Sequence, residues 1–486
     1  MVYWDNNNLK YILTKNVDLP NKMKRIFLLF FLSSLAFATA QAQSDVDIQR
    51  YIQIIKENIF KNYKGMFKPA RGNLKYPFIT PGSHSYNGQL WDWDSWLSDV
   101  ALRQILLENG DQKDRDEALQ YELGCVLNFL DFSQKGGWIP IMIDARSKTN
   151  SYDVFPIMVN DRSKPDNYDV FAHNMHKPCL AQHAAFLTKL NGGDAKWLQE
   201  KFPALEEFVD CYSSHYCNAA TGLYFWQTDE AIGVDNDPST FFRPVASSGS
   251  ILLNCLMYKE LKAMVYLATQ LDMKDVVGKY QKRADDLLDS IRKNCWDPKD
   301  GFYYSVDLDL RAVSAPATNG VFQWHSGASR DWNCLIQRLG VWSGFLPMWA
   351  GVATPEQAKE MVEKNFRDTN TFNAPYGVRS LSKLEKMYNG ARASSNPSNW
   401  LGPVWINANY MTFRGLVEYG YNDDAKELAK KTIVLLGQDF EKNGLLHEYY
   451  VPESGKPVMN PGFQNWNYLV LNMIAWYEGK PYVEEF

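Results

Sequence analysis

Residues 249–294 read GSILLNCLMYKELKAMVYLATQLDMKDVVGKYQKRADDLLDSIRKN, and this stretch decides the fold. Apolar residues recur at helical spacing through 249–270 and again through 274–294, with a short break between the two segments. Two helices joined by so short a connection are expected to pack as a hairpin. One hairpin cannot bury both of its apolar faces, so further helices must cover it.

Segments of the same kind recur along the chain, separated by polar or Gly/Pro-containing loops. We predict ten further helices near 46–63, 95–109, 114–133, 177–191, 195–214, 334–350, 354–366, 402–419, 422–442 and 464–478. About twelve helices make about six hairpins, which can bury their faces by closing into a ring. The prediction is an all-α fold, an (α/α)6 barrel or six-hairpin toroid, with long loops and short β ribbons at the active-site end.

The remaining segments fit one catalytic domain over residues 43–486. Strand-like stretches such as 222–226 and 301–305 are short and suit loop ribbons better than a central sheet. Two long non-helical stretches, about 135–176 and 297–332, are rich in Asp, Asn, Ser and Trp, as functional loops commonly are. No Pro/Ser-rich linker divides the chain.

The first 42 residues predict an upstream extension followed by a secretory signal peptide. Met23-Lys24-Arg25 leads into a short apolar run and then into small residues ending at Ala40 and Ala42. The apolar run is too short for a transmembrane helix, so we expect no membrane insertion after cleavage. The expected location is secreted or periplasmic.

Composition removes several classes of function. The formal charge is −5, and Lys and Arg are scattered along the chain, which argues against a nucleic-acid partner. The seven cysteines are odd in number and form no metal-ligand pattern, so we predict buried free thiols. The histidines show no His-x-x-x-His or His-x-His pair, so we expect no metal and no cofactor. Oligomeric state is left open.

Two loops each place a carboxylate among turn-forming residues: Asp229–Pro238, which contains Asp235, and His447–Gly455, which contains Glu448. Tryptophan-rich segments, 90–96 and 400–405, accompany them. Cleavage of a glycosidic bond needs one protonated carboxyl and one ionised carboxylate, and sugar rings suit aromatic plates flanked by polar groups. These features predict carbohydrate chemistry on an oligosaccharide or a small glycoside.

With these loops in place, the sequence resembles the catalytic domain of glycoside hydrolase family 63. The mannosylglycerate hydrolase type is closest in size, processing α-glucosidases share the domain, and the trehalases of family 37 are more distant. The resemblance spans nearly all of the mature chain, and the order of its motifs is more specific than any one of them. They are Leu90 to Trp96, Lys177-Pro178, Gly233 to Pro238, Trp296 to Tyr304, Pro375 to Ser382, Trp400 to Trp405, and His447-Glu448 with Ser454-Gly455.

The resemblance implies an (α/α)6 barrel that hydrolyses α-linked glucosides or mannosides with inversion. It implies Asp235 as general acid and Glu448 as general base, with carboxyl groups roughly 6.5–9.5 Å apart. Substrate contacts are expected from Trp91, Asp92, Trp93, Asp94, Trp96, Lys177, Trp400, Trp405 and Trp466. One position departs from the family, because Leu401 stands where Trp-Arg-Gly-Pro-Val-Trp has its Arg.

Other readings of these residues stay open at this point. Asp237 fits a turn residue that bonds its own backbone better than Asp235 does, and Asp92 or Asp94 could cap a helix. One of Trp91, Trp93 and Trp96 is expected to be a core residue. At the level of function, α/α toroids also host sugar epimerases and polysaccharide lyases, and a catalytically silent carbohydrate-binding protein is a third alternative.

Overall fold

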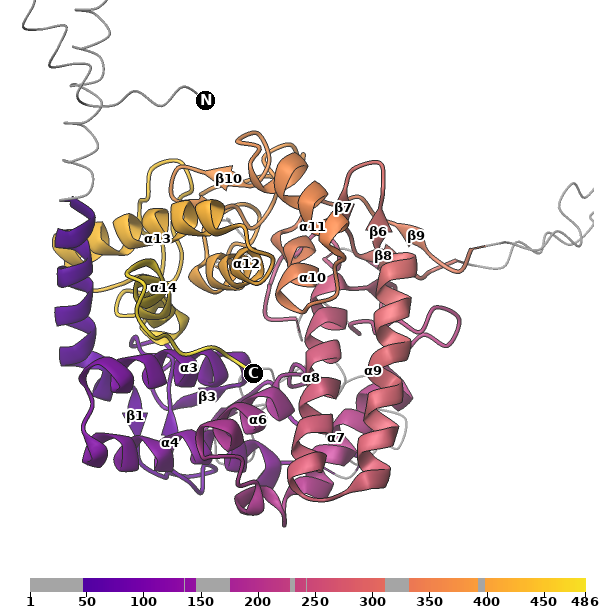
Figure 1. Cartoon of the computed structure of the whole chain (residues 1–486), viewed down its shortest axis with the longest axis horizontal. Coiled ribbons are helices and arrows are strands. Elements are labelled where there is room, and N and C mark those ends of the chain that lie inside the picture. The colour runs from indigo at the N-terminus through magenta and orange to yellow at the C-terminus, as the bar shows by residue number, and fades with distance from the viewer. Residues whose placement is uncertain are drawn as a thin grey trace, which may run out of the picture. The chain divides into compact units, whose positions relative to one another are not determined.

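A computed structural model describes residues 47–134, 136–145, 175–227, 232–241, 243–310, 332–391 and 398–486. The chain divides into two compact units, residues 1–53 and 54–486. The expected extension and signal peptide lie outside the described residues, as do most of the two predicted long loops. The larger unit contains a ring of helices (Figure 1).

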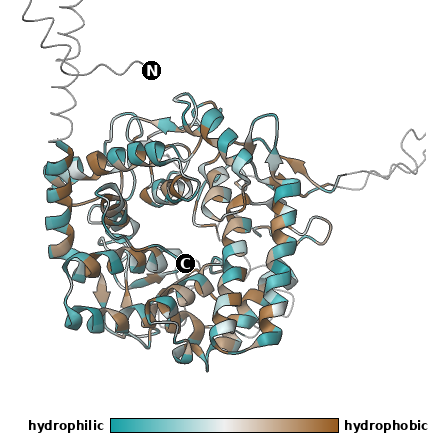
Figure 2. Cartoon of the chain, in the orientation of Figure 1, coloured by the Kyte–Doolittle hydropathy of each residue, from teal (hydrophilic) through white to brown (hydrophobic). Residues whose placement is uncertain are grey.

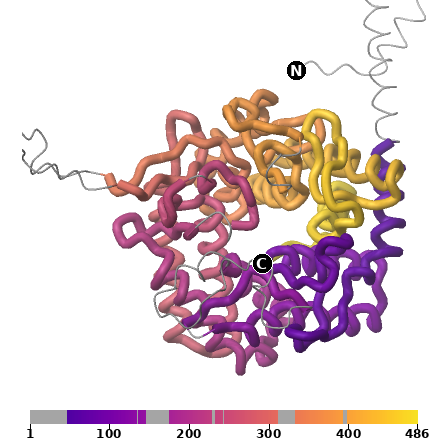
Figure 3. The backbone as a smooth tube through the Cα atoms, turned by 180° about the vertical axis from the view of Figure 1, so that it is seen from behind, coloured from indigo at the N-terminus to yellow at the C-terminus, as the bar shows by residue number. Residues whose placement is uncertain are grey.

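The inner layer of this ring consists of helices that each contact the next one, and the last contacts the first. The inner helices are α3 (Asp92–Asn109), α6 (Leu180–Leu190), α8 (Ile251–Gln270), α10 (Leu346–Trp349), α12 (Ile406–Glu418) and α14 (Val470–Tyr477). Seen from behind, the chain runs around the ring from indigo to yellow, which brings α14 beside α3 (Figure 3). The predicted six-hairpin toroid is confirmed.

An outer helix follows most of the inner ones. The outer helices are α4 (Gln112–Asp131), α7 (Phe202–His215), α9 (Lys274–Asn294), α11 (Pro355–Glu360) and α13 (Asn422–Asn443). A π-helical segment, η7 (Met361–Phe366), continues α11. Residues 47–62 are also helical, and Lys56 from this helix forms ion pairs with Glu108 and Glu478 at the ends of α3 and α14.

The two layers differ in how they bury their side chains. Outer helix α9 buries Tyr280, Ala284, Leu287 and Ile291, a single stripe at spacings of four and three residues. Its inner partner α8 buries residues on nearly every face, including Glu260. Figure 2 accordingly shows hydrophilic and hydrophobic stretches alternating along the helices. The periodic stripe explains why 274–294 could be bounded from sequence.

Helix boundaries follow local capping chemistry. Asp111 and Thr354 each form a capping box at the start of α4 and α11, satisfying backbone N–H groups that the helix leaves free. Helix α13 ends at Gly444, whose φ of 70° lies in the left-handed region that favours glycine. Asp111 and Thr354 thus mark where two short connections end, and Gly444 marks where the loop that carries Glu448 begins.

In the described residues, strands occur only as short antiparallel ribbons in the loops, as predicted. They are β1 (Phe67–Lys68), β2 (Phe78–Ile79), β3 (Gln89–Trp91), β4 (Met142–Asp144), β5 (Ser248–Gly249), β6 (Trp296–Asp297), β7 (Phe302–Tyr303), β8 (Val306–Asp307), β9 (Leu335–Ile336), β10 (Asn373–Ala374) and β11 (Gly377–Val378). The described residues also include four short 3-10 helices, η1 (Tyr63–Met66), η4 (Lys196–Leu198), η6 (Trp342–Phe345) and η8 (Asn465–Leu469). Of these ribbons, β3 matters most to the site because it leads directly into α3.

The predicted helix over 334–350 is wrong in its first half. Residues 335–336 form β9, and helical structure begins only with η6 and the four-residue α10. Arg338 has a φ of 50° and Gly340 follows it, so the backbone cannot continue as a right-handed helix there. The apolar run that suggested a helix is buried for a different reason, as part of the packed core around Trp342 and Phe345.

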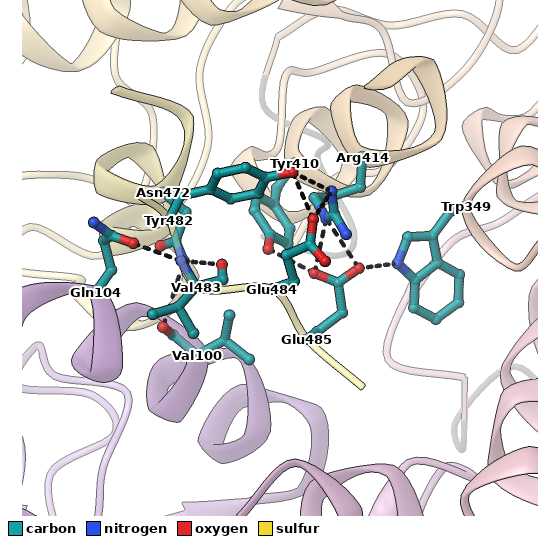
Figure 4. A network of polar contacts seen from close by, with 10 residues as sticks. All are labelled: Val100, Gln104, Trp349, Tyr410, Arg414, Asn472, Tyr482, Val483, Glu484 and Glu485. Atoms are coloured by element: carbon teal, nitrogen blue, oxygen red, sulfur yellow. Dashed lines mark hydrogen bonds and ion pairs between the residues drawn. The ribbon is translucent and has the colours of Figure 1, made fainter. Parts of the chain in front are cut away.

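The last residues of the chain run into the centre of the ring and tie its helices together (Figure 4). Glu485 accepts hydrogen bonds from Trp349 Nε1 at 2.9 Å and Tyr410 Oη at 2.6 Å, and Arg414 Nε lies 3.1 Å from its Oε2. Val483 N donates to Gln104 Oε1 on α3 at 2.8 Å. These contacts brace α3, α10 and α12 from within.

Candidate active site

One pocket gathers most of the predicted site residues. It is lined by Tyr86, Trp91, Trp93, Asp94, Ile141, Lys177, Gly233, Asp235, Ser398, Trp400, Trp405, Glu448 and Trp466. Asp235 and Glu448, which lie more than 200 residues apart in sequence, therefore share one pocket, as predicted. The pocket also gathers seven of the nine residues expected to contact substrate.

Glu448 is almost completely buried, with 4% of its surface exposed. Its Oε1 accepts a hydrogen bond from Tyr86 Oη at 3.0 Å, and its Oε2 accepts one from Asn460 Nδ2. Burial, with the negative charge of Asp235 acting in the same direction, raises the pKa of Glu448 to about 7, although the two hydrogen bonds lower it. A carboxylate with such a pKa can exchange a proton near neutral pH.

Tyr86 and Asn460 escaped the sequence analysis. Each lies in a turn sequence, Tyr86-Asn87-Gly88 and Asn460-Pro461-Gly462, and Asn460 has a φ of 46°, a backbone conformation that Asn tolerates better than most residues. Ser85 Oγ donates to Asn460 Oδ1 at 2.9 Å and fixes the amide. Turn chemistry was visible in the sequence, but nothing in it connected these turns to Glu448.

The loop that carries Asp235 is held through its neighbours. Asn236 accepts a hydrogen bond from Trp400 N at 2.7 Å and donates to Asn399 Oδ1 at 3.1 Å, which ties the loop to the tryptophan-rich segment. Asp237 accepts from Ser239 N at 2.8 Å, so it is the turn residue that the sequence predicted. Asp235 itself is partly exposed within the pocket.

Gly233 lets this loop pass close to Lys177. Its φ is 68°, and a Cβ at this position would lie 2.8 Å from Lys177 Nζ. A side chain here would therefore strain the backbone and displace the ammonium group. Gly233 lay inside a recognised motif, but its role as a pocket wall became clear only from the structure.

Lys177 and Asp92 form a buried ion pair beneath the pocket. Lys177 Nζ lies 2.9 Å from Asp92 Oδ1, and Lys177 N donates to Asp92 Oδ2 at 2.8 Å. The ammonium group also sits 4.7 Å from the centre of the Trp93 ring, where the aromatic face attracts a cation. Asp92 thus holds Lys177 and does not line the pocket, which corrects its predicted role as a substrate contact.

Asp94 does line the pocket and carries a strongly shifted pKa. Burial raises the pKa of Asp94 to about 8, with the nearby Asp92 carboxylate adding to the shift. Asn465 Nδ2 donates to its Oδ1 at 2.5 Å. A raised pKa favours the protonated form, and a protonated carboxyl group can both donate and accept hydrogen bonds, as sugar hydroxyls require. Neither Asp is the helix cap, because α3 begins with Asp92 and its N-cap residue is Trp91.

Aromatic rings form the walls of the pocket. Trp400 and Trp405 stack at a centroid distance of 3.9 Å with an interplanar angle of 5°, and Trp405 stacks in turn on Tyr449 at 4.8 Å. Trp93 meets Trp466 edge-to-face at 5.7 Å. Within the described part of the chain, the indole N–H groups of Trp400 and Trp466 have no hydrogen-bond acceptor. Buried donors of this kind usually find a partner, and a bound hydroxyl would supply one.

Trp96 is the second predicted substrate contact that the structure places elsewhere. It is fully buried and packs against Trp349 at a centroid distance of 6.3 Å, so it is the core tryptophan of the Trp91, Trp93 and Trp96 set. It lies one helical turn after the start of α3, and residue type alone could not reveal which of the three indoles belongs to the core. Leu401, the departure from the family motif, is also absent from the described pocket lining.

Other chemistries find little support in the described residues. All seven cysteines are free thiols, as predicted, but Cys217 and Cys334 are only half-buried. Across the described ranges, no three His, Cys, Asp or Glu side chains gather to hold a metal ion. The described pocket lining contains no histidine, which the epimerase alternative would need. The same ranges contain no helix with the length and apolarity to span a membrane.

Comparison with known sequences gives a match over most of the chain. Residues 86–467 match the mannosylglycerate hydrolase MGH1-like glycoside hydrolase domain. Mannosylglycerate hydrolase MGH1 of Selaginella moellendorffii is 31% identical over 134 residues, which are 28% of this chain and 24% of that protein. Mannosylglycerate hydrolase of Thermus thermophilus is 28% identical over 168 residues, 35% of this chain and 32% of that protein. The alignments thus span about a quarter to a third of these curated relatives.

Solved structures share the fold over a longer span. The family 63 mannosylglycerate hydrolase from Thermus thermophilus, in complex with glucose, aligns with a TM-score of 0.59 at 20% identity, covering 87% of this chain and 98% of that one. Neutral trehalase Nth1 from Saccharomyces cerevisiae aligns with a TM-score of 0.56 at 18% identity, covering 83% and 74%. At these identities the likeness establishes the fold.

Proposed function

The chain belongs to the mannosylglycerate hydrolase MGH1-like family of glycoside hydrolases, and from that premise we propose that it hydrolyses an α-linked glucoside or mannoside with inversion at the anomeric carbon. Asp235 is the general acid in this proposal and Glu448 is the general base. The single observation that carries it is the meeting of these two carboxyl groups in one pocket walled by tryptophans.

The chemistry requires one proton to be given and one to be taken. Asp235 donates its proton to the glycosidic oxygen as the bond to the anomeric carbon breaks. A water molecule attacks that carbon from the opposite face of the ring and passes its proton to Glu448. The pKa of Glu448, raised to about 7, supports this assignment because a stronger base accepts the water's proton more readily while remaining substantially ionised at neutral pH.

The pocket chemistry favours a sugar as ligand. Stacked indoles offer flat apolar surfaces for the C–H face of a ring, and Asp94 and the indole N–H groups of Trp400 and Trp466 offer polar contacts for its hydroxyls. The relatives named as mannosylglycerate hydrolases and trehalases suggest mannose or glucose as the reacting sugar. Secretion through the predicted signal peptide completes the proposal.

A substrate panel tests the proposal. Purified protein is incubated with α-glucosides, α-mannosides, trehalose and mannosylglycerate, and released sugar is quantified. We expect release from at least one substrate and loss of about 10²-fold or more in the Asp235→Asn variant, because the leaving group then has no proton donor. A folded wild-type protein that binds these sugars and releases nothing would favour the binding-only alternative.

A further inference from the structure

A second carboxylate, Asp439, lies behind the base Glu448. It comes from α13 and is 4% exposed. It is absent from the described pocket lining, so it does not meet the substrate there. A buried carboxylate costs folding free energy unless hydrogen bonds compensate it, so the identity of its donors shows what it stabilises.

Asn443 Nδ2, on the same helix, donates to Asp439 Oδ1 at 2.7 Å, and the other donors lie on the two sides of Glu448. His447 N donates to Asp439 Oδ2 at 3.1 Å, and His447 Nδ1 lies 2.9 Å from the same oxygen. Tyr450 Oη donates to it at 2.9 Å. The Asp439 carboxylate therefore accepts hydrogen bonds from His447, immediately before Glu448, and from Tyr450, two positions after it.

The His447–Asp439 pair resembles a catalytic dyad, but its location argues against that role. His447 is not among the described pocket residues, and its ring nitrogen Nδ1 faces Asp439. The pair instead fixes the backbone at His447, whose carbonyl oxygen accepts a hydrogen bond from Asn467 Nδ2 at 2.7 Å. Both backbone polar groups of the residue preceding the base are thus occupied.

Backbone hydrogen bonds also hold Glu448 and Tyr450 in place. Glu448 N donates to Met459 O at 2.8 Å, and Tyr450 and Val404 exchange two backbone hydrogen bonds of 2.9 and 3.0 Å. Asp439 adds to this frame the contacts with His447 and Tyr450, on both sides of Glu448. From this frame the Glu448 side chain accepts the hydrogen bond from Tyr86 Oη at 3.0 Å.

We propose that Asp439 is a positioning residue that holds the base Glu448 in register with Tyr86 and the pocket. The proposal rests on the proposed function in so far as Glu448 is called the base. A carboxylate displaced by about 1 Å can cost on the order of 10²-fold in rate without any loss of substrate contacts. Loss of Asp439 should therefore lower kcat and spare sugar binding.

The first test compares Asp439→Asn with Asp297→Asn. Asp297 is a matched control because it is also a buried aspartate, held by Arg338 Nε and Lys299 N, outside the pocket lining. We expect Asp439→Asn to lower kcat about 10- to 100-fold, with KM and the Kd of the released sugar within about threefold of wild type. Asp297→Asn should lower thermal stability and leave kcat of the folded protein within about twofold. Equal kcat in folded Asp439→Asn and wild type would overturn the proposal.

A second variant and a crystal structure distinguish the positioning role of Asp439 from the proposed function of the protein. Tyr450→Phe removes one donor to Asp439 and should lower kcat by about threefold to tenfold. This variant tests the positioning role if Asp439→Asn does not fold. Crystal structures should show the Glu448–Tyr86 contact kept in wild type and Asp297→Asn and broken in Asp439→Asn. If wild type is inactive on every glycoside but the contact breaks as expected, the proposed function fails while the positioning role stands. An unchanged contact contradicts the positioning role whatever the activity.

Discussion

Glu448 and Glu485 are both buried, with 4% and 6% of their surfaces exposed, and each accepts a hydrogen bond from a tyrosine. Their pKa values nevertheless move in opposite directions. The pKa of Glu448 is raised to about 7 by burial with Asp235 nearby, whereas Arg414 and Lys259 lower the pKa of Glu485 to about 2 against the effect of burial. The sign of the neighbouring charges decides which glutamate can exchange a proton near neutrality and which remains an ionised anchor.

The largest effect should come from neutralising the two glutamates one at a time. Glu448→Gln should lower kcat by about 10²- to 10⁴-fold, because no group then accepts the proton of the attacking water. Glu485→Gln should leave kcat of the folded protein within about twofold, since Glu485 lies outside the described pocket lining. Steady-state kinetics at a temperature where both variants are folded makes the comparison. Near-normal turnover in Glu448→Gln would refute the assignment of the base.

In stability, Glu485→Gln should be the more damaging of the two variants. The folded-state pKa of Glu485 is depressed, so its stabilising contribution is present above its ordinary pKa of 4.5 and is lost as pH falls toward 2. Glu485→Gln should therefore cost about 3 kcal/mol at pH 7, where it leaves Arg414 without its buried partner, and much less at pH 2.

The raised pKa of Glu448 gives the reverse dependence. Its charged form opposes folding increasingly as pH rises from 4.5 through 7, so Glu448→Gln should be more stable than wild type at pH 8 by about 3 kcal/mol and equally stable at pH 4. Denaturant unfolding of wild type and both variants from pH 2 to pH 8 provides the measurement. Parallel curves for the two variants would show that their environments do not differ as described.

The smallest expected effect concerns the tyrosine partners. Tyr86→Phe removes a hydrogen bond that lowers the pKa of Glu448, so the acidic limb of kcat/KM should move to higher pH and kcat should fall about tenfold. Tyr410→Phe removes the corresponding bond to Glu485 and should cost about 1 kcal/mol of stability with no change in the pH profile of activity. An unshifted acidic limb in Tyr86→Phe would break the link between that hydrogen bond and the base.

Local patterns made much of the fold predictable. Helix α9 has the predicted bounds of 274–294, and its buried residues follow one stripe. Helix α13, predicted over 422–442, ends one residue later, before Gly444. The prediction of a helix over 334–350 failed because the apolar residues there are buried through irregular structure after the positive φ of Arg338. Hydrophobicity reports burial, and only periodicity reports the element that achieves it.

The site was predictable where one residue and its loop carried the signal. Asp235 and Glu448 stood out through turn chemistry and family motifs, but the partners of Glu448 did not. Tyr86 lies 362 residues from Glu448 in sequence, and no spacing rule spans such a distance. For the same reason sequence could not distinguish Trp96, which faces the core, from Trp93, which faces the pocket.

The most direct test of the central claim is NMR spectroscopy of the hydrolysis reaction, recording which anomer of the released sugar appears first. A general acid and a general base acting from opposite faces of the ring predict that the β-anomer appears first from an α-linked substrate and then equilibrates. First appearance of the α-anomer would mean retention of configuration. Glu448 would then act as a nucleophile or not at all, and its assignment as the general base of an inverting reaction would be contradicted.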